Sequence, residues 1–416
     1  MIAAMTTLSS LTSTILIALF SGIASAQSKG PSADLAEQSI SSDQSIAVKA
    51  QDQLRLTGPQ GLELLQQLFA KEIMQHRRGM PADARWKRIG AALDRVARQY
   101  DDYSSGLYWY TDLEKAKAAA HASGRPILSL RLLGRLDEDL SCANSRFFRT
   151  TLYPDAEISG LLKDQFILHW ESVRPAPRIT IDFGDGRKLE RTITGNSIHY
   201  ILDADGKVMD VLPGLYSADV FTTELKLTLN AAKEIPRNGN GSYVQHMRAT
   251  HVRLLNAWAA DLAEIKWRPM SGPPDLFPIE QDLEKLTDDP TWQQIASMHT
   301  STVAFDGRVR ELMARKFPDA RTAAPLAVSK SAVEIPMLRA FPTLTNSIAL
   351  DTVRNNYMLR TRILAYLSGG EMQSLSLRQI NDWVYTVVFL TPKDDPWLGL
   401  APQNVFAALD GNGLTR

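Results

Sequence analysis

The sequence predicts an α/β protein in which a mixed sheet flanked by helices lies between an N-terminal helical section and a mostly α-helical C-terminal domain. Helix and strand patterns alternate from about residue 106 to 235. Apolar residues repeat at helical spacing before this segment, over 54–105, and after it, over 243–416. The length of 416 residues suffices for two or three domains, and the 44% hydrophobic and 22% charged content is typical of globular proteins.

Residues 1–26 are predicted to be a cleaved signal peptide. The apolar run "ILIALF" is followed by Ala24, Ser25 and Ala26, the small-residue pattern that precedes a cleavage site. No lysine or arginine precedes the apolar run, which is unusual for such a signal, and the alternative is a buried N-terminal helix. We therefore expect an exported protein, periplasmic or extracellular, whose single cysteine can form no internal disulfide.

The next two segments differ in their apolar content. Residues 27–53 are rich in Ser, Gln, Ala and Asp, and are predicted to be a flexible leader. Residues 54–105 are predicted to be helical, because two sets of apolar residues each fall on one helical face. These sets are Leu65, Leu68, Phe69 and Ile73, and Ile89, Leu93, Val96 and Tyr100.

The central segment begins with helices and two strands. "TDLEKAKAAAHASG" predicts a helix with Thr111 as its N-cap and Gly124 as its stop. The strand "RPILSLRLL" follows, and then a helix from about Cys142 to Leu152 and a second helix in "PDAEISGLLKDQ". "FILHWESV" is the next predicted strand.

Two hairpins and a helix complete the central segment. "ITIDFGDGRKLERTI" and "IHYILDADGKVMDVL" each predict two strands around an Asp-Gly turn, and "SADVFTTELKLTLNAA" predicts a helix. After the break "IPRNGNGS", residues 243–416 are predicted to be nearly all helical, with the Pro-rich "RPMSGPPDLFP" between two helical portions. Trp397, in "DDPWLGL", is expected to pack on this helical domain, and a partner-binding corner is the alternative.

Three stretches of the central segment follow one another in an informative order. The lead-in "LYWYTDLEKAKAAAHASGRPILSL" precedes a cysteine at a helix start, then comes "DAEISGLLKDQFILHW", and finally the hairpin and glycine of "SIHYILDADGKVMDVLPGLYSADVF". In this order the segment from about 106 to 232, roughly a third of the chain, resembles the thioredoxin-like superfamily, especially its exported members. The resemblance implies a thioredoxin-like fold with Cys142 at the redox position.

The sequence departs from the family pattern at this position. The C-x-x-C motif of the family is here C-x-x-S, formed by Cys142 and Ser145 in "CANS". Ser197 stands where the family usually has a cis-proline, and the loop before Cys142 is long and acidic at 137–139. The hairpin "ITIDFGDGRKLERTI" resembles an insertion. These departures weaken the expectation of redox activity more than that of the fold.

A single thiol limits the chemistry of Cys142. A dithiol oxidoreductase uses its second cysteine to resolve the mixed disulfide, and the Ser145 hydroxyl cannot do so. A helix N-terminus, together with Arg146 and Arg149, would lower the pKa of an exposed thiol, whereas the acidic residues 137–139 oppose this. Two alternatives stay open: a moderately reactive thiol, and an inert buried cysteine.

Other candidate chemistry is sparse. His199 lies two residues beyond Ser197 and could approach Cys142 as a base, and a buried sheet histidine is the commoner alternative. The seven histidines form no H-E-x-x-H motif and no tight cluster with aspartate, so we expect no metal site. "DADG" and "GDGR" resemble fragments of calcium- or phosphate-binding loops, but hairpin turns explain both. We therefore expect no cofactor.

Two functions are therefore expected as alternatives. The first is monothiol thiol–disulfide exchange or mixed-disulfide binding through Cys142, with Ser145 as hydrogen-bond donor to the thiolate. The second is a redox-inactive thioredoxin-like scaffold that binds another protein. The partner would be protein thiols or a protein, because 46 basic and 46 acidic residues select no nucleic acid and no segment after residue 26 is apolar enough to span a bilayer. The oligomeric state is not predicted.

Overall fold

The computed structural model describes most of the chain, over residues 32–192, 195–234, 240–265, 280–316, 344–369, 374–392 and 394–395. The predicted signal peptide, the Pro-rich stretch 268–278 and Trp397 lie outside these residues. Within the described ranges, no helix has the length and apolar character needed to cross a membrane.

The N-terminal region is a group of short helices. They are α1 (Ala33–Gln38), α2 (Gln44–Leu56), α3 (Pro59–Leu68), α4 (Ala70–Arg77) and α5 (Ala84–Ala97), followed by the 3₁₀ turn η1 (Asp102–Ser104). Together they enclose a hydrophobic core of their own, whose largest members include Leu54, Leu62, Leu65, Phe69, Ile89, Leu93 and Val96.

The flexible leader predicted over 27–53 is wrong for residues 33–53, which form α1 and most of α2. Ser32 Oγ accepts a hydrogen bond from the Leu35 N–H at 3.2 Å and caps α1. The Asp43 carboxylate caps α2. Both helices pack against the core through small buried side chains, so this segment folds although its composition is polar. These side chains are Ala36, Ala47 and Ala50.

The main sheet has four strands in the order β2-β1-β5-β6. They are β1 (Ile127–Leu133), β2 (Ile167–Arg174), β5 (Ser197–Leu202) and β6 (Val208–Pro213). β1 and β2 are parallel, β5 is antiparallel to β1, and β6 is antiparallel to β5, so the predicted mixed sheet is present. The central strand β1 is buried along its whole length, as its run of apolar residues predicts.

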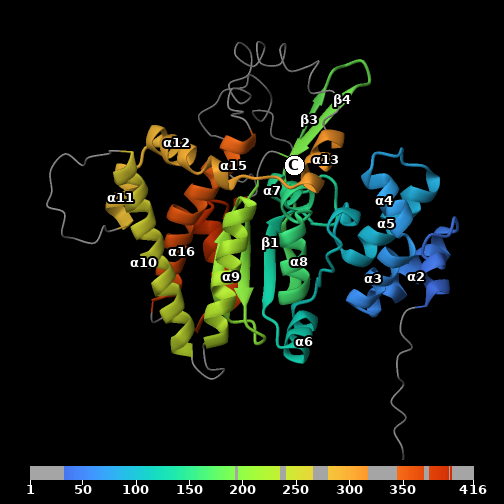
Figure 1. The fold of residues 1–416 in the computed structure, drawn as a ribbon, viewed down its shortest axis with the longest axis horizontal. Helices are drawn as coiled ribbons and strands as arrows, with labels where there is room; N and C mark the ends of the chain where they lie inside the picture. The colour runs from blue at the N-terminus through green and yellow to red at the C-terminus, as the bar shows by residue number, and fades with distance from the viewer. Residues whose placement is uncertain are drawn as a thin grey trace, which may run out of the picture. The chain divides into compact units, whose positions relative to one another are not determined.

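Helices cover this sheet, as Figure 1 shows for α6, α8 and α9. They are α6 (Leu113–Ser123), α7 (Ala143–Phe147), the π-helical turn η2 (Phe148–Leu152), α8 (Ala156–Gln165) and α9 (Ala218–Glu234). The N-cap of α6 is Asp112 and not the predicted Thr111, because the Asp112 carboxylate reaches the first free N–H groups. Gly124 ends α6 in the left-handed conformation, with φ 71°.

The predicted inserted hairpin forms a second, separate sheet. Its strands β3 (Arg178–Asp182) and β4 (Lys188–Thr192) are antiparallel and pair with each other. The hairpin extends away from the main sheet in Figure 1. All of β3 is exposed.

The C-terminal helices do not form a core separate from the sheet. They are α10 (Asn240–Glu264), α11 (Glu280–Leu286), α12 (Asp289–Met298), η3 (Thr300–Thr302), α13 (Gly307–Lys316), α15 (Leu344–Arg354), η5 (Asn355–Leu359), α16 (Arg360–Leu367), α17 (Leu377–Trp383) and η7 (Val384–Val388). Trp258, Leu364 and Val384 belong to the same hydrophobic cluster as the strands. The separate domain predicted over 243–416 is therefore corrected for its described residues.

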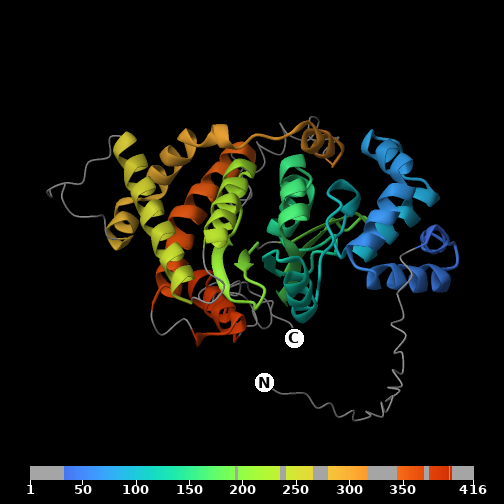
Figure 2. The same ribbon diagram turned by 60° about the horizontal axis from the view of Figure 1, so that its bottom comes forward.

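The C-terminal helices pack on the sheet at its β6 edge and across one face. Tyr200 and Asp210 point to opposite faces, because Tyr200 pairs with the neighbour of Asp210. The Tyr200 hydroxyl donates to Asn381 of α17 at 3.3 Å, so α17 covers one face. The Thr228 hydroxyl of α9 donates to Asp210 at 2.8 Å on the other face. In Figure 2, α9 lies beside the yellow-to-red helices.

Candidate functional site

Cys142 lies at the start of α7, in the connection that follows β1. It is the N-cap residue, and its Sγ accepts a hydrogen bond from the Ser145 backbone N–H at 3.4 Å. The predicted helix start at the cysteine is therefore present. α7 ends at Phe147, and the π-helical turn η2 continues it to Leu152.

The sulfur of Cys142 is enclosed. The residue has 0% of its surface exposed. Burial raises the pKa of the Cys142 thiol, and the N–H groups of Ser145 and Asn144 and the charge of Arg146 offset this only in part. Because the thiolate is the nucleophilic form, a raised pKa and a buried sulfur both oppose thiol–disulfide exchange in this conformation.

Segments far apart in the sequence enclose the start of α7. The Thr192 hydroxyl, at the end of the inserted hairpin, donates to the Ser141 carbonyl at 3.0 Å. The Tyr385 hydroxyl of η7 donates to the Asn196 carbonyl at 3.3 Å. Burial is the main cause that raises the pKa of the Tyr385 hydroxyl. The Cys142 sulfur lies close to it, so a thiolate there would raise this pKa further.

Ser145 does not take the role expected for it. Its hydroxyl donates to Ser141 Oγ at 2.8 Å, and its backbone N–H is the group that reaches Cys142. Ser145 is fully buried, so its hydroxyl has a stable partner away from the sulfur. The expected side-chain hydrogen bond to a thiolate is therefore replaced by an ordinary helix-capping bond.

Ser197 lies beside α7, as the alignment with the family predicts. The Asn144 side-chain N–H donates to Ser197 Oγ at 2.9 Å. The backbone before Ser197 is packed closely against α7, because a Cβ on Gly195 would lie 2.4 Å from Asn144 Oδ1. The described chain has no cis peptide bond, so the peptide bond before Ser197 is trans.

His199 is not brought to Cys142. Its Nε2 is hydrogen-bonded to the Tyr153 hydroxyl at 2.7 Å, and its ring contacts Phe148 and Phe221 edge to face. Burial lowers the pKa of His199 to about 3. A ring with so low a pKa is a weak base, and its nitrogen is bonded to Tyr153 and not to the sulfur, so the expected catalytic role is corrected.

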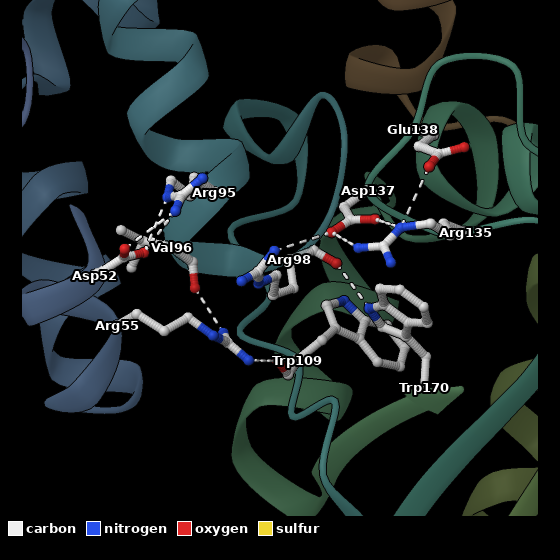
Figure 3. Close-up of polar contacts among 10 residues, drawn as sticks. All are labelled: Asp52, Arg55, Arg95, Val96, Arg98, Trp109, Arg135, Asp137, Glu138 and Trp170. Carbon is white, nitrogen blue, oxygen red and sulfur yellow. Dashed lines mark hydrogen bonds and ion pairs between the residues drawn. The ribbon is translucent and has the colours of Figure 1, made fainter. Parts of the chain in front are cut away.

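The acidic loop does not oppose the thiol. Asp137 accepts bonds from Arg135, the nearer at 2.8 Å, and pairs with Arg98 at 3.4 Å, and Figure 3 shows these groups pointing toward one another. Asp139 pairs with Arg149 at 3.2 Å. These pairs neutralise the loop, and they also keep Arg149 from the role expected for it beside the thiol.

Arg131 and Tyr385 are the residues near this site that sequence reasoning missed. Arg131 lies on β1 with 6% of its surface exposed, pairs with Glu171 of β2, and leaves its Nε without a partner. Burial lowers the pKa of Arg131 to about 10. The signal for Arg131 was a charged residue within the apolar strand "ILSLRLL". No local sequence pattern predicts that Tyr385 lies near Cys142, because this position depends on contacts between residues far apart in the sequence.

Two clefts among the described residues do not reach the thiol. One, of about 250 Å³, lies between α3 and the end of α8 and is lined by residues that include Tyr108, Tyr110, Arg125 and Lys163. Another, of about 340 Å³, is lined mainly by α10, α16, α17 and the β5–β6 turn. Cys142 lines neither. Among the described residues, no group of three His, Cys, Asp or Glu side chains could hold a metal ion.

Comparison with known proteins gives no match: no family model, no curated protein and no solved structure matches the chain.

Proposed function

We propose that the chain is an exported, redox-inactive thioredoxin-like scaffold that binds another protein. The observation that carries this proposal is the enclosed sulfur of Cys142, which has 0% of its surface exposed and serves as a helix cap. A resolving cysteine is absent from the sequence as well.

The arrangement around β1 supports the thioredoxin-like part of the proposal. A cysteine begins the helix that follows the central strand, and that strand has a parallel neighbour on one side and an antiparallel hairpin on the other. This is the order of elements on which the resemblance rests. The trans peptide bond before Ser197 and the absence of a second cysteine from the sequence fit a member of that superfamily without redox chemistry.

The covering of the sulfur supports a scaffold over a monothiol enzyme. An incoming disulfide must reach Sγ directly, in line with the bond that breaks. Tyr385 lies close to the sulfur, belongs to the packed core of the molecule and is hydrogen-bonded to the Asn196 carbonyl, so it would first have to move. Thiol exchange therefore needs an opening that the scaffold function does not.

The inserted hairpin supports protein binding. Ile181 and Phe183 have 42% and 56% of their surfaces exposed. Exposed apolar side chains gathered on a projecting element are typical of protein-interaction sites. The hairpin root is held by Thr192 beside Ser141, so it is a fixed element of the scaffold.

A capture experiment under non-reducing conditions tests the proposal. The full chain and its Cys142→Ala variant serve as baits in an extract of the exported proteins, and both are expected to retain the same partner. Phe183→Asp is expected to lose that partner, whereas Leu56→Asp, at an exposed apolar position on α2, is the matched control that keeps it. A partner that is held as a mixed disulfide, or that is lost with Cys142→Ala, would overturn the scaffold proposal in favour of thiol chemistry.

A further inference from the structure

We infer that the free edge of β3 pairs with β3 of a second copy of this chain, so that two hairpins join into one four-stranded antiparallel sheet. This inference goes beyond the proposed function and does not depend on it. It rests on the exposure of the strand, the direction of its free backbone groups and the order of its charges.

The edge of β3 is open. All five residues of the strand are exposed, and within the described chain β3 pairs with β4 alone. A two-stranded hairpin is marginally stable in water, and added strands stabilise it. An open edge is also a template for pairing with another chain.

The free backbone groups of β3 lie at alternate residues. The Phe183 N–H donates to the Arg187 carbonyl at 3.1 Å across the hairpin, and antiparallel ladders alternate bonded and non-bonded pairs. Ile181 and Ile179 therefore bond to β4 as Phe183 does. The N–H and C=O groups of Arg178, Thr180 and Asp182 point outward instead and are available to a new strand.

The charge order of β3 is complementary to itself. The strand reads "RITID". In an antiparallel pair centred on Thr180, Arg178 lies opposite Asp182 of the second copy, and Ile179 lies opposite Ile181. Opposite charges that face each other across strands stabilise the pair, whereas like charges destabilise it.

The backbone and the charges select the same register. Thr180 has outward N–H and C=O groups, so two copies of it can exchange both hydrogen bonds at the symmetry axis. Arg178 and Asp182 also have outward groups and form the next bonded pairs. A shift by one residue would remove the Arg–Asp pairs, so the centred register is favoured.

Contacts already present at the edge do not prevent pairing. Arg178 lies 3.7 Å from Glu138, and Asp182 lies 3.2 Å from Lys188, and all four side chains are exposed. Exposed ion pairs contribute little and exchange readily. Edge strands that avoid association carry charges that repel a second copy, but β3 carries one charge of each sign at matching positions.

A charge-swap experiment tests the pairing and its register. Sedimentation velocity of the full chain is expected to show a dimer at high micromolar concentration. Arg178→Asp alone and Asp182→Arg alone each place like charges across the axis, and each dissociation constant is expected to rise about tenfold. An equal mixture of the two variants restores opposite charges and is expected to form a heterodimer. Because the mixture recovers association, loss of folding cannot imitate this result.

A pair of proline variants separates the two edges of the hairpin. Thr180→Pro removes an outward N–H from β3 without removing a bond to β4, and is expected to abolish the dimer. Glu190→Pro, opposite Thr180 on β4, makes the same change at the other edge and is expected to keep it. A monomeric wild type, a dimer that survives Thr180→Pro, or a charge-swapped mixture that stays monomeric would each overturn the inference.

Discussion

The N-terminal and C-terminal helical regions are attached to the sheet in different ways. The N-terminal helices enclose their own hydrophobic core and meet the β2 side of the sheet through polar groups. The C-terminal helices share the hydrophobic core of the sheet and meet its β6 edge through buried charges. Burial in a common core makes two elements unfold together, whereas a polar seam lets one open alone.

Arginine side chains make most of the polar contacts between the N-terminal helices and the sheet, which we call the N-terminal seam (Figure 3). Arg55 of α2 donates to the carbonyls of Val96 and Trp109, joining two helices to the chain that leads into the sheet domain. The Trp170 indole N–H of β2 donates to the Arg98 carbonyl at 2.8 Å. These bonds align the region with the sheet.

Buried ion pairs hold the C-terminal region to β6. Arg360 of α16 donates to Asp210 at 2.8 Å and to Glu224 of α9 at 2.7 Å. Burial alone would raise the pKa of Asp210, but Arg360 and His246 hold it below its usual value. The carboxylate stays charged in the interior, so the network depends on all its members.

The largest expected effect is at this network. Arg360→Met leaves the Asp210 and Glu224 carboxylates buried without their cation, and is expected to lower the free energy of unfolding by about 3–5 kcal/mol. Urea denaturation followed by fluorescence and circular dichroism should show the sheet and the C-terminal helices unfolding in one transition. Arg354→Met is the control, because its pair with Asp289 is exposed, and it should change stability by about 0–1 kcal/mol. Equal effects of the two variants would contradict the comparison.

A smaller and more local effect is expected at the N-terminal seam. Arg55→Met removes the donors to two partly buried carbonyls and is expected to destabilise the N-terminal region by about 2–3 kcal/mol. Hydrogen exchange should speed up over 33–104 and stay unchanged in β1. The matched control is Arg95→Met, whose pair with Asp52 is exposed. Faster exchange in β1 would show that the two regions are not independent.

The N-terminal region should also respond to pH in a direction set by two carboxyl groups. Burial raises the pKa of Asp94 to about 7, and it raises that of Asp102 well above its usual value. The folded chain therefore keeps protons that the unfolded chain releases, so stability is highest below about pH 4 and falls as the pH rises to about 7. The rise of the Asp94 pKa from 3.8 to about 7 corresponds to a loss of about 4 kcal/mol from that carboxyl group alone. Hydrogen exchange corrected for its intrinsic pH dependence measures it, and Asp94→Asn should flatten the profile; a profile that rises toward pH 7 would contradict the assignment.

The smallest expected effect is at the cover of the thiol. Tyr385→Phe removes the hydrogen bond to the Asn196 carbonyl, worth about 1 kcal/mol, so alkylation of native Cys142 should speed up about fivefold. Tyr366→Phe is the control, because the Tyr366 ring stacks on Trp383 and its hydroxyl has no hydrogen bond within the described chain. An equal rate in both variants would show that Tyr385 does not limit access.

Much of the sheet could be predicted because its signals are local. The run "ILSLRLL" and the two Asp-Gly turns lie where β1 and the two hairpins form. The helices α1 and α2 were not predicted, because the alanines spaced along α2 add little hydrophobicity to the composition although they pack well. The separate C-terminal domain was also wrong, because a linker with Gly and Asn marks a turn and does not show which core the next helix joins.

The candidate site could be located from the sequence but not understood from it. Cys142 caps a helix beside Ser197, as the order of motifs predicts. Its burial depends on Tyr385 and Thr192, which lie far from it in the sequence. Whether His199 reaches it depends on the face of β5 to which the His199 side chain points. Sequence spacing carries no information on such long-range contacts, so the reactivity of the thiol was left open.

The rate of alkylation of Cys142 in the native full chain, compared with the rate in urea, tests the central claim most directly. We expect negligible native labelling and fast labelling in urea, with protection that Arg360→Met reduces and Arg55→Met leaves unchanged. Native labelling as fast as that in urea would contradict the account, because it would mean that the sulfur meets solvent and is free to react.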